Sequence, residues 1–272
     1  VDNVGNPIKT TDEVAAVSGG DVYLSIDKDL QVATYKLLEQ ELAGILSSKI
    51  ANIKEYNTSE DSDSDILIPI YEVYFALVNN ELIDTDALNT TDSTSLEKEV
   101  YQSYESKQSM VLNELETQLT AEKPTAYKDL DGEYQDYFTF IIKMLKSEGI
   151  LNNDAIDTSD PMQVKWSAEQ LSVKEYLTYA IEQNWIDITS YTSESKYSNS
   201  DELYQSLVSY ILSDLTNNHN FSKQIYHYAI LQDMIRGNQL CAILYDQGVL
   251  AADDTTRNAL ANGSMSAYGF ML

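Results

Sequence analysis

The sequence predicts a mainly α-helical protein, a multi-helix bundle of two related helical units with one short strand near the N-terminus. Apolar residues make up 43% of the 272 residues and include 20 tyrosines, which is enough for a folded core. Only 4 prolines and 10 glycines are present, too few for the many turns of a β-sandwich or barrel. Most of the chain also repeats its apolar residues at helical spacing.

The strand is predicted at residues 21–27. Val22, Leu24 and Ile26 alternate with more polar neighbours, which is the period of a half-buried strand. Asp27 then offers a side-chain oxygen to the first free N–H groups of a helix. We therefore expect a helix to begin after Asp27.

That first helix keeps its apolar spacing from Leu30 to about Lys54. Clusters of Asp, Ser and Thr follow along the chain, and they supply the caps and turns between further helices. These helices are expected at residues 66–80, 94–119, 132–147, 167–183, 201–215, 221–245 and 253–261.

An internal repeat is suggested by matching segments that keep their order. Residues 99–103 (EVYQS) recur as residues 202–206 (ELYQS), and residues 82–84 (LID) match residues 185–187 (WID) at the same shift. The pattern predicts a duplication, with convergent helical patterning as the alternative. We expect a linker, strand and first helix in 1–56, helical unit 1 in 57–160 and helical unit 2 in 161–272.

The charge balance excludes two classes of partner. The chain has 17 basic and 44 acidic residues and a formal charge of −27. Such a surface repels phosphate backbones and anionic lipid headgroups, so no nucleic-acid partner is expected. No run of 18 apolar residues occurs, so direct membrane insertion of this segment is not expected either.

The residues that most often carry chemistry are scarce. Cys241 is the only cysteine and lies in an apolar run, so a buried thiol is expected. His219 and His227 are expected in surface or packing roles. Tyrosines such as Tyr226 and Tyr228 suit packing between helices with the hydroxyl at the rim, or the lining of a groove.

One acidic segment resembles the front of a calcium loop. Asp61, Asp63 and Asp65 alternate there, and Glu72 falls at the twelfth position. The sixth position needs glycine for its sharp turn, but Ile66 stands there. We interpret the segment as a solvated linker, and predict no metal site and no cofactor.

Residues 20–31 read GDVYLSIDKDLQ and carry a family resemblance. They resemble the opening of a penicillin-binding transpeptidase domain, in which a strand ending in Thr/Ser-Ile-Asp leads into a helix beginning Asp-Leu-Gln. The chain is similar to the class B type of Gram-positive anaerobes, where a long helical insertion separates this helix from the catalytic core. Segments 184–187 and 240–248 resemble parts of that insertion.

The chain departs from that family in its catalytic motifs. The family uses a Ser-x-x-Lys nucleophile, a Ser-x-Asn and a Lys-Thr/Ser-Gly. Ser95 and Ser193 each begin a Ser-x-x-Lys match, but the other two motifs are missing from the sequence. We therefore expect no catalytic residue in this chain, although the parent protein would be a peptidoglycan D,D-transpeptidase.

The resemblance implies a function and a location. The chain would be a non-catalytic insertion or scaffold segment in peptidoglycan synthesis, docking other cell-wall synthesis or division proteins. It would lie at the extracellular face of the cytoplasmic membrane, in a membrane-anchored parent from which it is trimmed. One alternative is a free-standing extracytoplasmic helical protein that binds glycan or peptide. Another is a hydrolase that uses paired carboxylates.

Overall fold

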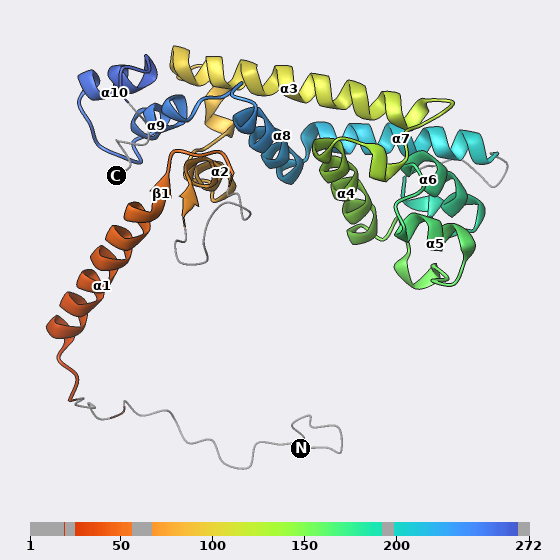
Figure 1. Cartoon of the computed structure of the whole chain (residues 1–272), viewed down its shortest axis with the longest axis horizontal. Coiled ribbons are helices and arrows are strands. Elements are labelled where there is room, and N and C mark those ends of the chain that lie inside the picture. Colours follow the sequence, from red (N-terminus) through yellow and green to blue (C-terminus); the bar gives the residue numbers. More distant parts are fainter. Residues whose placement is uncertain (1–18, 20–24, 56–66, 192–198, 266–272) are drawn as a thin grey trace. The chain divides into compact units, whose positions relative to one another are not determined.

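A computed structural model of the chain describes residues 19, 25–55, 67–191 and 199–265 (Figure 1). These residues are mainly helical, which confirms the predicted fold class. Two compact units are present, Val1–Leu46 and Ser47–Leu272. The helix α1 (Lys28–Lys49) begins in the first unit and ends in the second.

The start of α1 is as predicted, but its end is not. One carboxylate oxygen of Asp27 accepts hydrogen bonds from the backbone N–H groups of Asp29 and Leu30, at 2.9 and 3.0 Å. The helix ends at Lys49 instead of continuing to 54, because β1 (Ile50–Ala51) pairs in parallel with β2 (Ile68–Pro69). A pairing between segments so far apart leaves no periodic signal in either segment.

The predicted N-terminal strand is only partly within the described residues. Residues 21–24 lie outside them, and Ser25, Ile26 and Asp27 form no strand. In the part of the chain that the structure describes, the sheet consists of β1 and β2 alone.

The second unit is built from nine α-helices and four short 3₁₀ helices within its described residues. The α-helices are α2 (Ile70–Asn79), α3 (Ser95–Thr120), α4 (Gly132–Ser147), α5 (Pro161–Ser167), α6 (Val173–Glu182), α7 (Ser200–Asn217), α8 (His219–Leu231), α9 (Gly237–Asp246) and α10 (Asp254–Ala261). The 3₁₀ helices are η1 (Asp86–Asn89), η2 (Tyr127–Asp129), η3 (Asn153–Ala155) and η4 (Ile188–Ser190).

Two of the predicted helices were wrong in extent. The segment 221–245 is two helices, α8 and α9, because Asp233 takes a left-handed conformation with φ of 59°. Ile235 then turns back into the core and donates its N–H to the carbonyl of Ala229 at 3.1 Å. The segment 167–183 begins with the last residue of α5, and α6 starts only after Ser172, whose side chain caps it.

The same turn ends several helices. A residue in the left-handed conformation follows each helix, and an apolar residue two positions later donates its N–H to a carbonyl in the last turns of that helix. The left-handed residues are Glu81, Gly149, Asp233 and Gly248, and the donors are Ile83, Leu151, Ile235 and Leu250. Ile83, Leu151 and Ile235 are buried, so these turns also anchor the connections in the core.

The segments that suggested a repeat share local geometry. The helices α2 and α6 each have 10 residues and each is followed by a left-handed residue. Ile83 and Ile186 are both buried, and the carboxylates of Asp84 and Asp187 each accept a backbone N–H that opens η1 or η4. The division into 57–160 and 161–272 stays a prediction, since both ranges contribute to the unit Ser47–Leu272.

In the long helices α3 and α7, the match of sequence and the match of buried positions differ in register by one residue. The buried positions of α3 include Val100, Tyr104, Lys107 and Val111, and those of α7 include Tyr204, Val208, Ile211 and Leu215. These two sets share their spacing, yet Tyr101, which aligns with Tyr204 by sequence identity, is only partly buried. One residue along a helix turns a side chain by about 100°.

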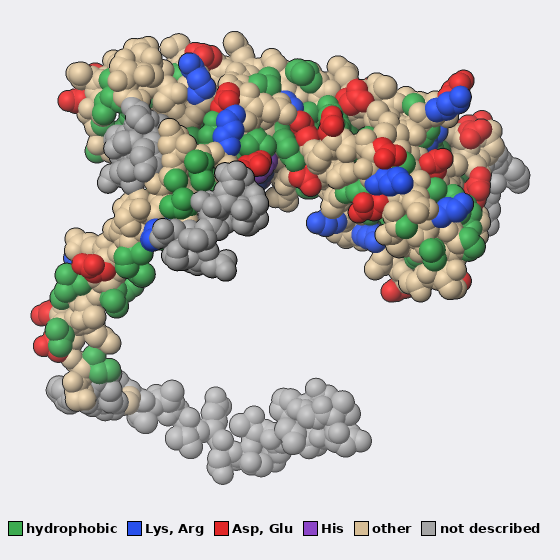
Figure 2. All heavy atoms as spheres, in the orientation of Figure 1, with side chains coloured by type: hydrophobic (Ala, Val, Ile, Leu, Met, Phe, Trp, Pro, Cys, Tyr) green, Lys and Arg blue, Asp and Glu red, His purple; other side chains and the backbone are tan. Residues whose placement is uncertain are grey.

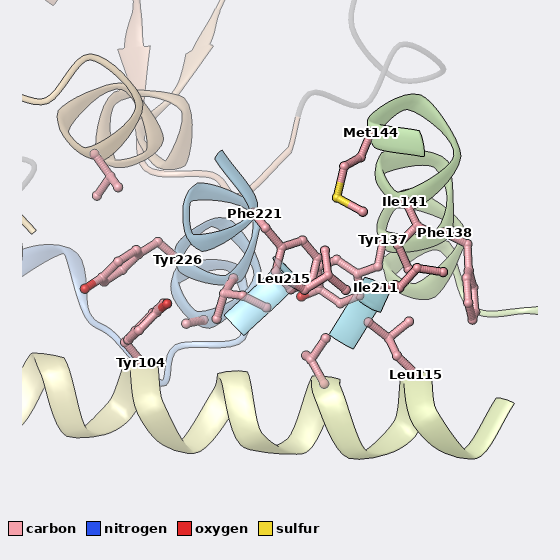
Figure 3. Packing of buried hydrophobic residues seen from close by; sticks show 14 of the residues in the cluster. Tyr104, Leu115, Tyr137, Phe138, Ile141, Met144, Ile211, Leu215, Phe221 and Tyr226 are labelled. Atoms are coloured by element: carbon pink, nitrogen blue, oxygen red, sulfur yellow. The ribbon is translucent and has the colours of Figure 1, made fainter. Parts of the chain in front are cut away.

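The helix α3 is the long axis of the core in this unit. It contacts α6, α7, α8, α9 and η1, and Figure 1 shows it running alongside α7 and α8. Its buried stripe meets aromatic side chains from the other helices (Figure 3). Tyr104 stacks on Tyr226 of α8 with ring centres 4.4 Å apart, and Tyr137 meets Phe221 edge-on at 5.5 Å.

Replacing Leu115 by alanine tests the packing of α3 in the core. Leu115 is fully buried in α3, so Leu115→Ala is expected to lower the free energy of unfolding by about 2–5 kcal/mol. The measurement is urea unfolding followed by circular dichroism. Met110→Ala on the same helix is the control, because Met110 is 59% exposed, and its effect should stay within about 0.5 kcal/mol. Equal effects of the two changes would contradict this packing.

Candidate functional site

The candidate functional surface is the apolar part of α1. None of its residues is buried, although the helix and the short segment just before it carry many large apolar side chains. Leu30 is 66% exposed and Tyr35 is 68% exposed. The exposed apolar side chains are Ile26, Leu30, Val32, Tyr35, Leu37, Leu38, Leu42, Ile45 and Leu46. In Figure 2, green apolar side chains are visible along this helix.

This apolar surface is wider than the face of an ordinary amphipathic helix. At 100° per residue, the side chains from Leu37 through Leu30 and Leu38 to Leu46 cover an arc of about 180°, which also contains the polar residues Gln31 and Glu41. Lys36, Glu39 and Gln40 lie in the remaining arc. A surface helix typically presents an apolar stripe of about 100°, whereas a wider one is enclosed by several elements. The arc therefore fits several neighbouring elements better than one partner helix.

A hollow of about 850 Å³ lies against this segment. All the described residues that border it belong to Ser25–Glu39, so it is an open flank of the helix. Its surface is formed by side chains such as Leu30, Tyr35 and Leu38. The arrangement offers an area for burial and no convergent catalytic groups.

Cys241 is placed as predicted. It is fully buried in α9, and burial raises the pKa of its thiol to about 12. A thiol in such surroundings stays protonated, and the protonated form is a poor nucleophile. Cys241 is therefore a core residue.

Both histidines lie at helix contacts. The ring of His227 is half-buried, 3.9 Å from the ring of Phe75, and desolvation lowers its pKa. Its ring also lies near Glu72 and Asp136, whose charges oppose that shift. His219 is exposed and its Nε2 is 3.3 Å from Oε1 of Glu81. These positions agree with the predicted surface and packing roles.

The tyrosines considered as lining for a groove pack between helices. Tyr226 is 2% exposed, and Tyr228 donates its hydroxyl to Asp136 Oδ2 at 2.6 Å from a partly buried position. Tyr204 is buried and donates its hydroxyl to the carbonyl of Leu119 at 2.8 Å. The predicted packing role is thus confirmed for Tyr226 and Tyr228, and neither ring is free to line a groove.

The Ser-x-x-Lys matches that begin at Ser95 and Ser193 have different positions. Ser95 is an exposed residue in the first turn of α3, beside a capping box formed by Thr94 and Glu97. Among the described contacts, no hydrogen bond joins the side chains of Ser95 and Lys98. Ser193 lies outside the described residues.

The acidic segment that resembles a calcium loop is also only partly within the described residues. Residues 61–65 lie outside the described residues, while Glu72 is exposed in the first turn of α2. In the described part of the chain, no group of His, Cys, Asp and Glu side chains is arranged to hold a metal ion.

A buried charged cluster was missed in the sequence. The ammonium of Lys107 on α3 forms an ion pair with Glu133 and donates a hydrogen bond to Gln232 Oε1 at 2.8 Å. Gln232 in turn donates to Glu133 Oε2 at 2.6 Å, and Tyr137 donates to Glu133 Oε1 at 2.9 Å. The available signal was the helical spacing of Tyr104, Lys107 and Val111, which puts the lysine on the apolar face.

Comparisons with family models, with characterised proteins and with solved structures found no match to the chain. The family resemblance therefore rests on the sequence segments alone. Among the helices that the structure describes, none has both the length and the apolar character needed to cross a bilayer.

The buried position of His227 predicts a pH dependence. Its folded-state pKa is lowered from about 6.5, so the unfolded chain binds a proton more readily. The free energy of unfolding should therefore fall as the pH falls below about 6.5. His227→Phe keeps the contact with Phe75 and should make the decline between pH 7.5 and 5.5 shallower, as measured by urea unfolding. An unchanged slope, or a ring that titrates above 6.5 by NMR, would refute the assignment.

Proposed function

We propose that this chain is a non-catalytic helical segment of a class B penicillin-binding protein that takes part in peptidoglycan synthesis. In this proposal, α1 is an element of the transpeptidase domain, and the helices α2 to α10 form a scaffold that docks other cell-wall synthesis or division proteins. The observation that carries the proposal is the exposed apolar arc of α1.

Burial of this arc is the physical reason for the first half of the proposal. Apolar surface gains about 25 cal/mol for each Å² removed from water. Leu37, Leu38 and Leu42 are each more than half exposed, so they would gain most from enclosing elements. The resemblance of residues 20–31 to the opening of a transpeptidase domain independently supports this part of the proposal. A helix enclosed on several sides suits a position inside such a domain.

The non-catalytic part of the proposal rests on the residues available. Ser95 and Lys98 are one helical turn apart, but the Ser-x-Asn and Lys-Thr/Ser-Gly motifs that complete the family site are missing. The alternative of a free-standing binding protein with tyrosine-lined faces receives less support, because rings such as Tyr204 and Tyr226 lie in the core.

Labelling with a fluorescent penicillin tests the absence of transpeptidase chemistry. We expect no covalent label on the purified chain. The chain lacks both the complete nucleophilic site and the motif that binds the carboxylate of the acyl donor. The readout is in-gel fluorescence together with intact-mass spectrometry. A complete class B penicillin-binding protein is the positive control. Stoichiometric acylation of Ser95 or Ser193 would overturn the proposal.

Polar substitutions in α1 test its membership of another domain. The triple change Leu37→Gln, Leu38→Gln and Leu42→Gln should alter the free energy of unfolding of this chain by less than about 0.5 kcal/mol. In the whole gene product the same change should remove penicillin labelling, because each buried leucine lost costs about 2–5 kcal/mol.

The control for this experiment is Lys36→Gln and Glu39→Gln, two changes in the polar arc of α1 that should leave labelling intact. If the triple variant of the whole gene product labels and unfolds like the parent, α1 does not belong to the core of that domain.

A further inference from the structure

A second hollow, of about 310 Å³, lies between α4, the end of α5 and η2. We call it the Trp166 pocket. Its lining combines two aromatic rings, two lysines and three side chains that can hydrogen-bond. The lining residues are Tyr127, Thr139, Ile142, Lys143, Lys146, Trp166, Ser167 and Glu169. Its volume is at the lower end of the range for small-molecule sites, about 300–1,000 Å³, which suits a ligand with a single ring.

The aromatic wall is held in place before any ligand arrives. Trp166 stacks on Tyr176 with ring centres 4.4 Å apart and an angle of 9° between the rings. Tyr127 meets Trp166 edge-on at 5.7 Å, and its hydroxyl lies 2.6 Å from the hydroxyl of Thr139. Such fixed rings give a ligand contact area without a further loss of side-chain freedom.

Backbone hydrogen bonds fix the two walls relative to each other. The N–H of Tyr127 donates to the carbonyl of Leu171 at 2.9 Å, and the N–H of Lys128 donates to the carbonyl of Glu169 at 3.2 Å. Glu169 has φ of 59°, which ends α5 and places this residue at the border of the pocket. The shape of the pocket is therefore set by main-chain contacts.

The charge at the pocket differs from that of the whole chain. Lys143 and Lys146 lie one turn apart on α4, and both are exposed. Among the described residues, neither forms an ion pair or a side-chain hydrogen bond. In Figure 2, several of the blue lysine and arginine side chains lie over the part of the unit that contains α4 and α5. Two free ammonium groups beside an aromatic wall favour an anion in a chain whose net charge is −27.

We propose that the Trp166 pocket binds a pyranose-sized sugar that carries a carboxylate. The ring would lie against Trp166 and Tyr127, whose π systems attract the partly positive C–H groups of a sugar face. The ammonium groups of Lys143 and Lys146 pair with the carboxylate, and Ser167 and Glu169 bond the sugar hydroxyls. This proposal does not depend on the proposed function.

The test is a titration of the purified chain with D-glucuronate, followed by tryptophan fluorescence. The chain has two tryptophans, and Trp185 is only 5% exposed, so a change in emission reports mainly on Trp166. We expect saturation with a Kd of about 1 mM, and binding of D-glucose at least about ten-fold weaker. Raising the salt concentration should weaken glucuronate binding, because the lysines are exposed.

Substitutions separate this site from general attraction of anions. The double change Lys143→Gln and Lys146→Gln should weaken glucuronate binding about five-fold, as expected for two exposed ion pairs. The double change Lys98→Gln and Lys123→Gln alters the net charge equally outside the pocket and should leave the Kd unchanged. Trp166→Phe should remove the fluorescence response.

Each of three results would overturn the proposal. The first is equal affinity for glucose and glucuronate, and the second is equal weakening by the two lysine pairs. The third is no response in fluorescence or calorimetry up to about 50 mM glucuronate, far above the concentration at which the expected site saturates.

Discussion

The packing of α3, α4 and α8 depends on how a single buried ammonium group is satisfied. Lys107 interrupts the apolar stripe of α3, and an unpaired charge in that position would cost several kcal/mol. Glu133 at the start of α4 and Gln232 at the end of α8 meet this group and also bond each other. Apolar side chains tolerate small sliding movements, whereas this cluster requires one position for three helices. It therefore gives the bundle a defined register as well as its buried surface.

Local chemistry made much of the fold predictable. Asp27 caps α1 as expected, and the helix predicted at 132–147 has the bounds of α4. The break between α8 and α9 could not be predicted. Asp233 takes the left-handed conformation there, which is usually adopted by glycine. The pairing of β1 with β2 was hidden for another reason. Each strand has two residues, and residues 52–67 separate the two strands in the sequence.

The two candidate surfaces also differ in how much of them the sequence predicts. The leucines of α1 were visible at helical spacing, but nothing in that spacing predicts that they remain exposed in the described structure. The Trp166 pocket was not predicted, since Tyr127, Lys143 and Trp166 come from three separate elements. Only the fold brings them together. The number of tyrosines was a poor guide to binding, because rings such as Tyr204 and Tyr228 pack between helices and donate their hydroxyls to groups on neighbouring helices.

The recurring left-handed turn has a consequence for how the chain reaches its structure. Each turn at Glu81, Gly149, Asp233 and Gly248 closes through hydrogen bonds to the helix just before it. A helix and its turn can therefore form without waiting for distant segments, and loop closure of this kind is fast. Topologies rich in such local contacts fold more quickly than those that depend on distant pairing. The slower steps are then left to the long-range contacts, which include the packing of α3 against α7 and α8, the charged cluster around Lys107 and the short pairing of β1 with β2.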